Sequence, residues 1–242
     1  DFSPLAKEGF DSSPITADRP FASASRRTIP QLDRMLVIAA ALTLLAGTLL
    51  GTTALRDSPT PIRAGLMAFN ALIGAGYFLI EIVIILTYQT VFVSPSVSLV
   101  YVLGLLLISS AVGGLLASQW DIRASTVALA SMCAVALAAP PTLMAADMAP
   151  WLTKSIAIGC VAGTGALMGV YFPRGLAIAR SAGAGQWIPH LFAINGIAGS
   201  FAVVLALYLG VKIGYRWTAA IALACYALAA IVAQTMVLRR ER

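Results

Sequence analysis

One acidic side chain, Glu81, interrupts an apolar run that extends from about residue 64 to residue 92. A carboxylate near the centre of a bilayer costs about 2.5–3.5 kcal/mol. We therefore expect Glu81 to face the interior of a helix bundle, to be protonated, or to pair with a cation. Polar or small residues recur around it at the helical steps of one stripe: Asn70, Gly74, Tyr77 and Tyr88. The other faces of this helix, rich in Leu, Ile, Val and Phe, are expected to meet lipid.

The stripe has two interpretations. In the first, it forms part of a ligand, ion or proton site, because ionisable groups inside membranes are usually functional. A buried carboxylate suits an ammonium group, so a small cationic ligand fits this interpretation. In the second, the stripe is a buried hydrogen-bonded network that holds helices together. The sequence leaves both open.

A second group of polar residues follows Pro173, which is expected to end or bend a helix. Arg174 lies just beyond it and is a candidate cation for Glu81. Trp187 is expected to belong to an interfacial aromatic belt. Together with the stripe, this region completes the candidate intramembrane polar site: Asn70, Tyr77, Glu81, Tyr88, Arg174, His190 and Asn195.

Metal, disulfide and catalytic motifs are not found. His190 is the only histidine, so no histidine metal site can form from this chain alone. The three cysteines, Cys133, Cys160 and Cys225, are far apart and lie in apolar runs, which favours small helix residues over disulfides or metal ligands. No nucleophile has a nearby base. The sequence thus predicts neither a cofactor nor a catalytic residue set.

The composition indicates what kind of chain must position these residues. Of 242 residues, 60% are hydrophobic and 11% are charged, whereas soluble domains carry about 25% charged residues. The net charge of +6 is typical of a membrane protein with basic flanks. No basic stripe with interleaved aromatics suggests nucleic acid. We therefore predict an integral membrane protein in contact with the lipid bilayer.

The fold class follows from the lengths of the apolar segments. A helix needs about 20 residues to cross the hydrocarbon, and the near-absence of charge and of dyad alternation excludes strands. We predict an all-α, polytopic transmembrane helical bundle at residues 35–242 behind a polar tail at residues 1–34. Seven segments are long enough to span: 35–55, 64–92, 97–117, 124–144, 152–172, 191–211 and 217–238.

The basic residues give conflicting evidence on orientation. Arg26, Arg27 and Arg34 favour a cytoplasmic N-terminus, whereas arginines at the other end of the chain favour a cytoplasmic C-terminus. Seven spans cannot satisfy both. One resolution is that residues 173–190, which contain several glycines and prolines, form a re-entrant segment.

Glycines spaced four apart predict close helix packing rather than a phosphate-binding loop. Gly159 with Gly163 and Gly165 with Gly169 form two such pairs, and the region around Gly196 and Gly199 forms a third. Gly113 and Gly114 are interpreted as a packing notch.

Three features, one short segment and two helix pairs, resemble bacterial polytopic membrane proteins fused to a spermidine-synthase-like domain. TADRPF at residues 16–21 resembles the segment that closes the synthase-like domain, although Ala17 replaces an acid there. GYFLIE at 76–81, followed by VSPSVSLVYVLGLLLISSAVGG at 93–114, resembles one helix pair of the family. FPRGL at 172–176 with INGIAGS at 194–200 resembles another.

The resemblance implies a C-terminal membrane module in the bacterial cytoplasmic (inner) membrane, with a synthase-like fold before residue 1. Three functions remain open. The leading hypothesis is a non-catalytic module that anchors a fused synthase-like domain or packs with other membrane subunits. The second is a transporter or binding bundle for a polyamine or another cation that uses Glu81. The third is the membrane part of an aminopropyltransferase-like enzyme.

Overall fold

The computed structural model describes residues 30–54, 61–92, 95–146 and 148–240, and every regular element in these ranges is helical. The predicted tail, residues 1–34, lies mostly outside them, and the first described helix begins at Pro30, ahead of the predicted boundary at 35. The long helices are α2 (Pro30–Ala54), α3 (Pro61–Thr87), α4 (Pro95–Leu115), α5 (Ile122–Ala145), α6 (Pro150–Gly169), α7 (Tyr171–Ser181), α8 (Ile188–Ile213) and α9 (Tyr215–Arg240). Three short 3₁₀ turns join them: η1 (Tyr88–Thr90), η2 (Ala117–Gln119) and η3 (Gly185–Trp187).

Seven segments of the described chain are long and apolar enough to cross a bilayer. They match the seven predicted spans, which confirms an all-α polytopic bundle. The predicted fifth span is a composite, because α6 and α7 together form one apolar stretch from Pro150 to Ser181. Many large apolar side chains are exposed on these helices, including Val37 at 68% and Leu115 at 82%. Such surface belongs in the acyl chains of a lipid bilayer.

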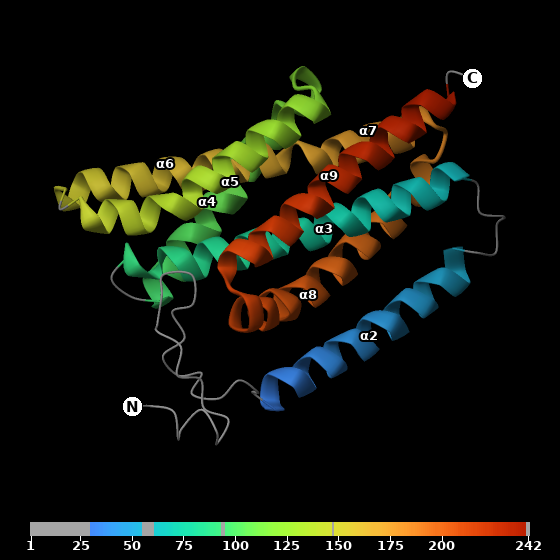
Figure 1. Ribbon diagram of the computed structural model, residues 1–242. Helices are drawn as coiled ribbons and strands as arrows, with labels where there is room; N and C mark the ends of the chain where they lie inside the picture. Colours follow the sequence, from blue (N-terminus) through green and yellow to red (C-terminus); the bar gives the residue numbers. More distant parts are fainter. Residues whose placement is uncertain (1–29, 55–60, 93–94, 147, 241–242) are drawn as a thin grey trace.

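The helices form two groups around α3 (Figure 1). α3 packs most extensively on α8 and α9, and α2 lies along α8. In the second group, α6 packs between α4 and α5. The two groups meet where α3 contacts α4 and where α5 contacts α9.

The central position of α3 corrects one expectation. Its apolar faces were expected to meet lipid, but Leu79, Ile80 and Val83 are each no more than 2% exposed. α3 is enclosed on nearly all sides because α8 and α9 cover the faces that α4 and α5 leave open. A fully enclosed helix is apolar all round, so its sequence resembles that of a lipid-facing one.

Glycines bring α4 and α6 into backbone contact. A Cβ atom at Gly113 would overlap the carbonyl of Ala166, and one at Gly169 would overlap the carbonyl of Ser110. The predicted packing role therefore holds for these glycines and for Gly165, which faces Ser109. It does not hold for Gly159, whose Cβ position meets nothing within 4 Å.

The region suspected to be re-entrant is helical. α7 continues α6 after a break at Val170, and the two helices form one bent rod (Figure 1). Pro173 explains the break, because it has no N–H to donate to the carbonyl of Gly169. The rest of the region is a short connection through η3 to α8, so the prediction of a re-entrant segment was wrong. The start of α2 and the end of α9 accordingly lie at opposite ends of the bundle (Figure 1).

Candidate functional site

Glu81 lies within the protein, on the part of α3 that the two helix groups enclose. Its side chain is 4% exposed, as expected for an acid shielded from acyl chains. Among the described residues, none donates a hydrogen bond to its carboxylate or forms an ion pair with it. Tyr77 lies about one helical turn before Glu81 on α3. Glu81 is therefore a sequestered acid without a bound partner inside the described bundle.

Tyr88 and Asn70, at the two ends of the stripe, are both fully buried. The Tyr88 hydroxyl donates a hydrogen bond of 3.0 Å to the carbonyl oxygen of Ala136 on α5. The side-chain amide of Asn70 donates one of 2.8 Å to Leu66 within α3, while its Oδ1 atom is buried without a partner. These two residues fit the structural interpretation, since they connect or stabilise helices.

The side chain of Asn195 on α8 reaches the backbone of α3. Its side-chain amide donates a hydrogen bond of 3.1 Å to the backbone carbonyl of Asn70. The helices approach closely here because Gly74 leaves room for the backbone of Asn195. Asn195 thus makes an interhelical polar contact inside the bundle, and its place in a functional site stays a prediction.

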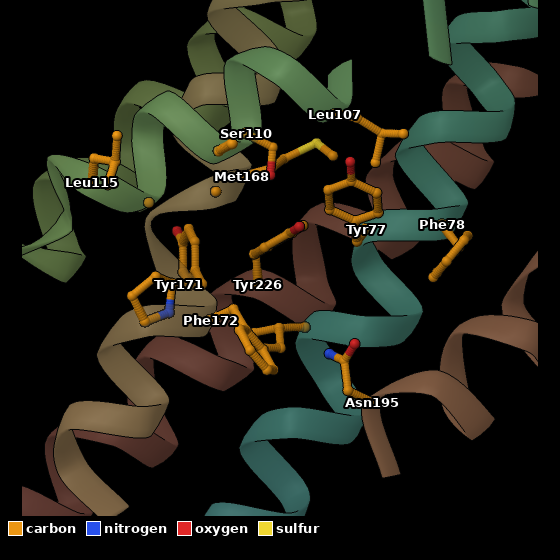
Figure 2. A pocket seen from close by; sticks show the side chains of 15 residues that line it. Tyr77, Phe78, Leu107, Ser110, Leu115, Met168, Tyr171, Phe172, Asn195 and Tyr226 are labelled. Carbon is orange, nitrogen blue, oxygen red and sulfur yellow. The ribbon is translucent and has the colours of Figure 1, made fainter. Parts of the chain in front are cut away.

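A pocket of about 550 Å³, which we call the tyrosine pocket, lies between the two helix groups. Figure 2 shows Tyr77, Tyr171 and Tyr226 around it, with Ser110 on α4 and Asn195 on α8 adding polar groups. The complete lining is Ile73, Tyr77, Phe78, Leu107, Ser110, Ala111, Gly114, Leu115, Met168, Gly169, Tyr171, Phe172, Pro173, Asn195 and Tyr226.

The tyrosines of the pocket are held by contacts with neighbouring helices. The rings of Tyr171 and Tyr226 meet edge to face with their centroids 4.6 Å apart. The Tyr171 hydroxyl donates a hydrogen bond of 2.7 Å to Oγ1 of Thr126. The hydroxyl oxygen of Tyr77 is buried and makes no hydrogen bond within normal geometry, although Ser110 lies near it on the opposite wall. The pocket therefore offers aromatic surface and, at Tyr77, a buried hydroxyl that has no hydrogen-bond partner among the described residues.

The pocket opens towards the surface of α4. Leu107 and Leu115 belong to its lining and are 54% and 82% exposed. Gly169 and Pro173, which flank the break between α6 and α7, form part of the opposite wall. Irregular backbone at membrane depth is tolerated where it lines a cavity. The exposed side chains at this opening are apolar, as expected for a surface in contact with acyl chains.

Arg174 is not the partner of Glu81. Its guanidinium donates a hydrogen bond to the carbonyl oxygen of Trp120, beside Asp121 at the start of α5. The next residue along α7, Gly175, packs against Phe69 and Asn70 of α3. These two residues lie about three helical turns before Glu81 on the same helix. The candidate residues are therefore dispersed, because Arg174 lies at the start of α7 and Tyr88 lies in η1 beyond the end of α3.

Trp187 and His190 also differ from expectation. Trp187 is 5% exposed, so it is buried rather than part of an interfacial belt. The guanidinium carbon of Arg63 lies over its ring, 4.6 Å from the centroid. The polar neighbour of Trp187 is therefore Arg63 and not a lipid headgroup. The His190 ring lies 5.0 Å from that of Trp187, and its buried Nδ1 atom has no hydrogen-bond partner. Both residues lie outside the tyrosine pocket.

Sequence reasoning missed three lining residues, Ser110, Tyr171 and Tyr226. Each lies in an apolar run, and its hydroxyl group is the only feature of the sequence that could have marked it as a site residue. Tyr171 directly precedes the FPRGL stretch and Tyr226 lies near the middle of the last span, so the depth of a tyrosine inside a span could have identified them. The other potential ligands are dispersed, since no group of three His, Cys, Asp or Glu side chains gathers within the described ranges.

A scan against protein-family models, a search of curated proteins and a search of solved structures find no match to this chain.

Proposed function

We propose that this membrane protein binds a small organic cation in the tyrosine pocket, with Glu81 as the compensating charge. One observation carries the proposal. A pocket of about 550 Å³ walled by three tyrosines lies one helical turn from a buried carboxylate that no described cation neutralises.

The chemistry of the wall favours a cation. The faces of aromatic rings attract positive charge, and the attraction strengthens when both partners are shielded from water. Residues four apart on a helix lie about 5–6 Å apart at their Cβ atoms, so Glu81 is close behind Tyr77. A cation between the tyrosines would therefore meet ring faces and the field of the acid together.

The shape of the pocket favours an amphipathic ligand. Its volume falls within the range of about 300–1,000 Å³ that small-molecule sites occupy. Its mouth is apolar because Leu107 and Leu115 flank it, and its interior carries hydroxyls. Its position between two helix groups, beside a broken helix, is also the arrangement found in many transporters, so release to the opposite side would make the protein a transporter.

The test is equilibrium binding of radiolabelled tetraphenylphosphonium and spermidine to the purified protein in lipid nanodiscs. We expect saturable binding of at least one cation and none of neutral triphenylphosphine oxide. Glu81→Gln removes the charge, and Ser110→Phe fills the pocket without altering a tyrosine. Each should weaken binding by about tenfold or more, which corresponds to about 1.4 kcal/mol of binding free energy.

Tyr88→Phe is the matched control, because Tyr88 shares the stripe of Glu81 but lies outside the pocket lining. It should bind as the wild type does. The proposal is overturned if folded Glu81→Gln and Ser110→Phe proteins bind both cations with unchanged affinity, or if neither cation binds the wild type.

A membrane-module role is the second candidate, and α2 is the observation that favours it. α2 packs along α8, and none of the residues in its most apolar window is buried. Such a helix is free to pack against another membrane subunit or to connect the bundle to a synthase-like domain in a bacterial cytoplasmic membrane. Cysteine crosslinking from Leu42, which is 60% exposed, in native membranes tests it: a crosslinked partner supports this role, and modification by lipid-soluble reagents alone counts against it.

A further inference from the structure

A second cavity, of about 670 Å³, lies at the end of the bundle where α5 begins and α7 and α9 approach their ends. It is separate from the tyrosine pocket and shares no lining residue with it. Its charged or polar lining residues are Asp121, Arg123, Arg174, Ser181 and Gln234, and the remainder is apolar.

Two guanidinium groups reach this cavity from different helices, and neither forms an ion pair with a carboxylate of the described residues. Arg123 donates a hydrogen bond of 2.7 Å to Oε1 of Gln234 on α9. Arg174 donates to the carbonyl oxygen of Trp120, and its buried Nε atom has no acceptor. Each guanidinium carries five N–H donors, so most of this donor capacity is not used by the described protein.

The acid in the lining is already engaged. Oδ2 of Asp121 accepts hydrogen bonds from the backbone N–H groups of Arg123 at 2.9 Å and Ala124 at 3.1 Å, which caps α5. The hydrogen bond from Ala124 lowers the pKa of Asp121, and so do the backbone hydrogen bond from Arg123 and the positive charges of Arg123 and Arg174. Asp121 is therefore ionised at neutral pH. Two positive groups and one negative group leave the cavity with a net positive charge.

The limits of the apolar spans indicate that this cavity lies near the depth of the lipid headgroups. Asp121 falls between the spans that end at Leu115 and begin at Ile122. Trp120 beside it is 41% exposed, in the position that interfacial tryptophans prefer. Basic pockets between membrane helices at this depth are known to take lipid phosphates.

We propose that Arg123 and Arg174 bind the phosphate of an anionic lipid headgroup, which sits between α5, α7 and α9 while its acyl chains remain in the bilayer. The planar guanidinium matches the geometry of a phosphate and can donate two parallel hydrogen bonds to it. The bound phosphate would balance the excess positive charge and connect three helices that meet at this end.

Native mass spectrometry of the purified, full-length protein tests the proposal, with phosphatidylglycerol and phosphatidylcholine titrated in turn. We expect the wild type to hold one phosphatidylglycerol at least about tenfold more tightly than phosphatidylcholine. Arg123→Gln and Arg174→Gln should each remove most of this preference, since hydrogen bonds to charged groups contribute on this scale. Arg180→Gln is the matched control: Arg180 is exposed on the same helix as Arg174 but outside the cavity lining.

A further variant and a competition experiment with inorganic phosphate extend this test. Gln234→Glu places a carboxylate against Arg123 and should reduce phosphatidylglycerol binding without removing an arginine. Displacement of the lipid by inorganic phosphate, but not by chloride at equal ionic strength, would support the phosphate site while assigning it to a water-soluble ligand. Equal binding of both lipids by the wild type, or unchanged preference in the folded Arg123→Gln and Gln234→Glu proteins, would overturn the proposal.

Discussion

Tyr171 donates a hydrogen bond of 2.7 Å to Oγ1 of Thr126, which in turn donates one of 2.7 Å to the carbonyl of Ile122. This chain joins the first residue of α7, directly after the helix break, to α5. It also fixes the ring of Tyr171 against that of Tyr226 in the pocket wall. The broken helix is thus connected at its break to a span that lies 45 residues away in the sequence.

Tyr171→Phe should lower the free energy of unfolding by about 0.5–1.5 kcal/mol, because it removes one buried hydrogen bond and keeps the ring. Thr126→Val should have a similar effect. The double variant should cost less than the sum of the two single variants, since both delete the same bond. Chemical denaturation in detergent micelles measures all three, and strict additivity would show that the bond contributes nothing.

Gly165→Ala and Gly113→Ala should each destabilise the bundle by about 1–3 kcal/mol, the usual scale of overpacking. Their Cβ atoms would overlap Ser109 and the backbone of Ala166 respectively, so α4 and α6 would have to separate. Gly159→Ala and Gly104→Ala are matched controls on the same two helices, because nothing lies within 4 Å of their Cβ positions. Thermal denaturation should leave the controls equal to or more stable than the wild type, as alanine favours helix over glycine.

Asn195→Ala should lower stability by about 0.6 kcal/mol, the average contribution of an interhelical side-chain hydrogen bond in a membrane. The variant removes the bond to the carbonyl of Asn70 that links α8 to α3. Ser200→Ala is the control, because its exposed hydroxyl bonds to Gly196 within α8 alone. A loss of stability as large in Ser200→Ala as in Asn195→Ala would contradict this role.

Acidification should remove the stabilising effect of the Asp121 cap. The pKa of Asp121 is lowered below its ordinary 3.8 in the folded protein, mainly by the hydrogen bond from the N–H of Ala124. A group of this kind contributes its full stabilisation above the unfolded pKa, and loses it as the pH falls through the folded pKa. The melting temperature of the wild type should therefore fall relative to Asp121→Asn below about pH 4. An Asn cap does not titrate, so parallel curves for both proteins would contradict the prediction.

The seven spans could be predicted from sequence because the bilayer imposes a minimum length and excludes charge. The burial of Glu81 follows from the same physics, since an acid exposed to acyl chains is strongly disfavoured. The break near Pro173 was also predictable, because the missing N–H is a property of the residue itself. The burial of the Glu81 stripe, the bundle class and the bend between α6 and α7 were thus determined by local chemistry and by the solvent.

The tertiary structure alone decided which helices meet. In a bilayer, lipid and protein interior are equally apolar, so the hydropathy pattern cannot tell a central helix from a peripheral one. For that reason the sequence did not show that Leu79 and Ile80 of α3 are buried, or that Arg63 rather than a headgroup covers Trp187. The same uncertainty hid the meeting of Tyr77, Tyr171 and Tyr226, and the separation of Arg174 from Glu81. These relationships depend on close packing of glycines and on hydrogen bonds between distant spans, which form only when the bundle assembles.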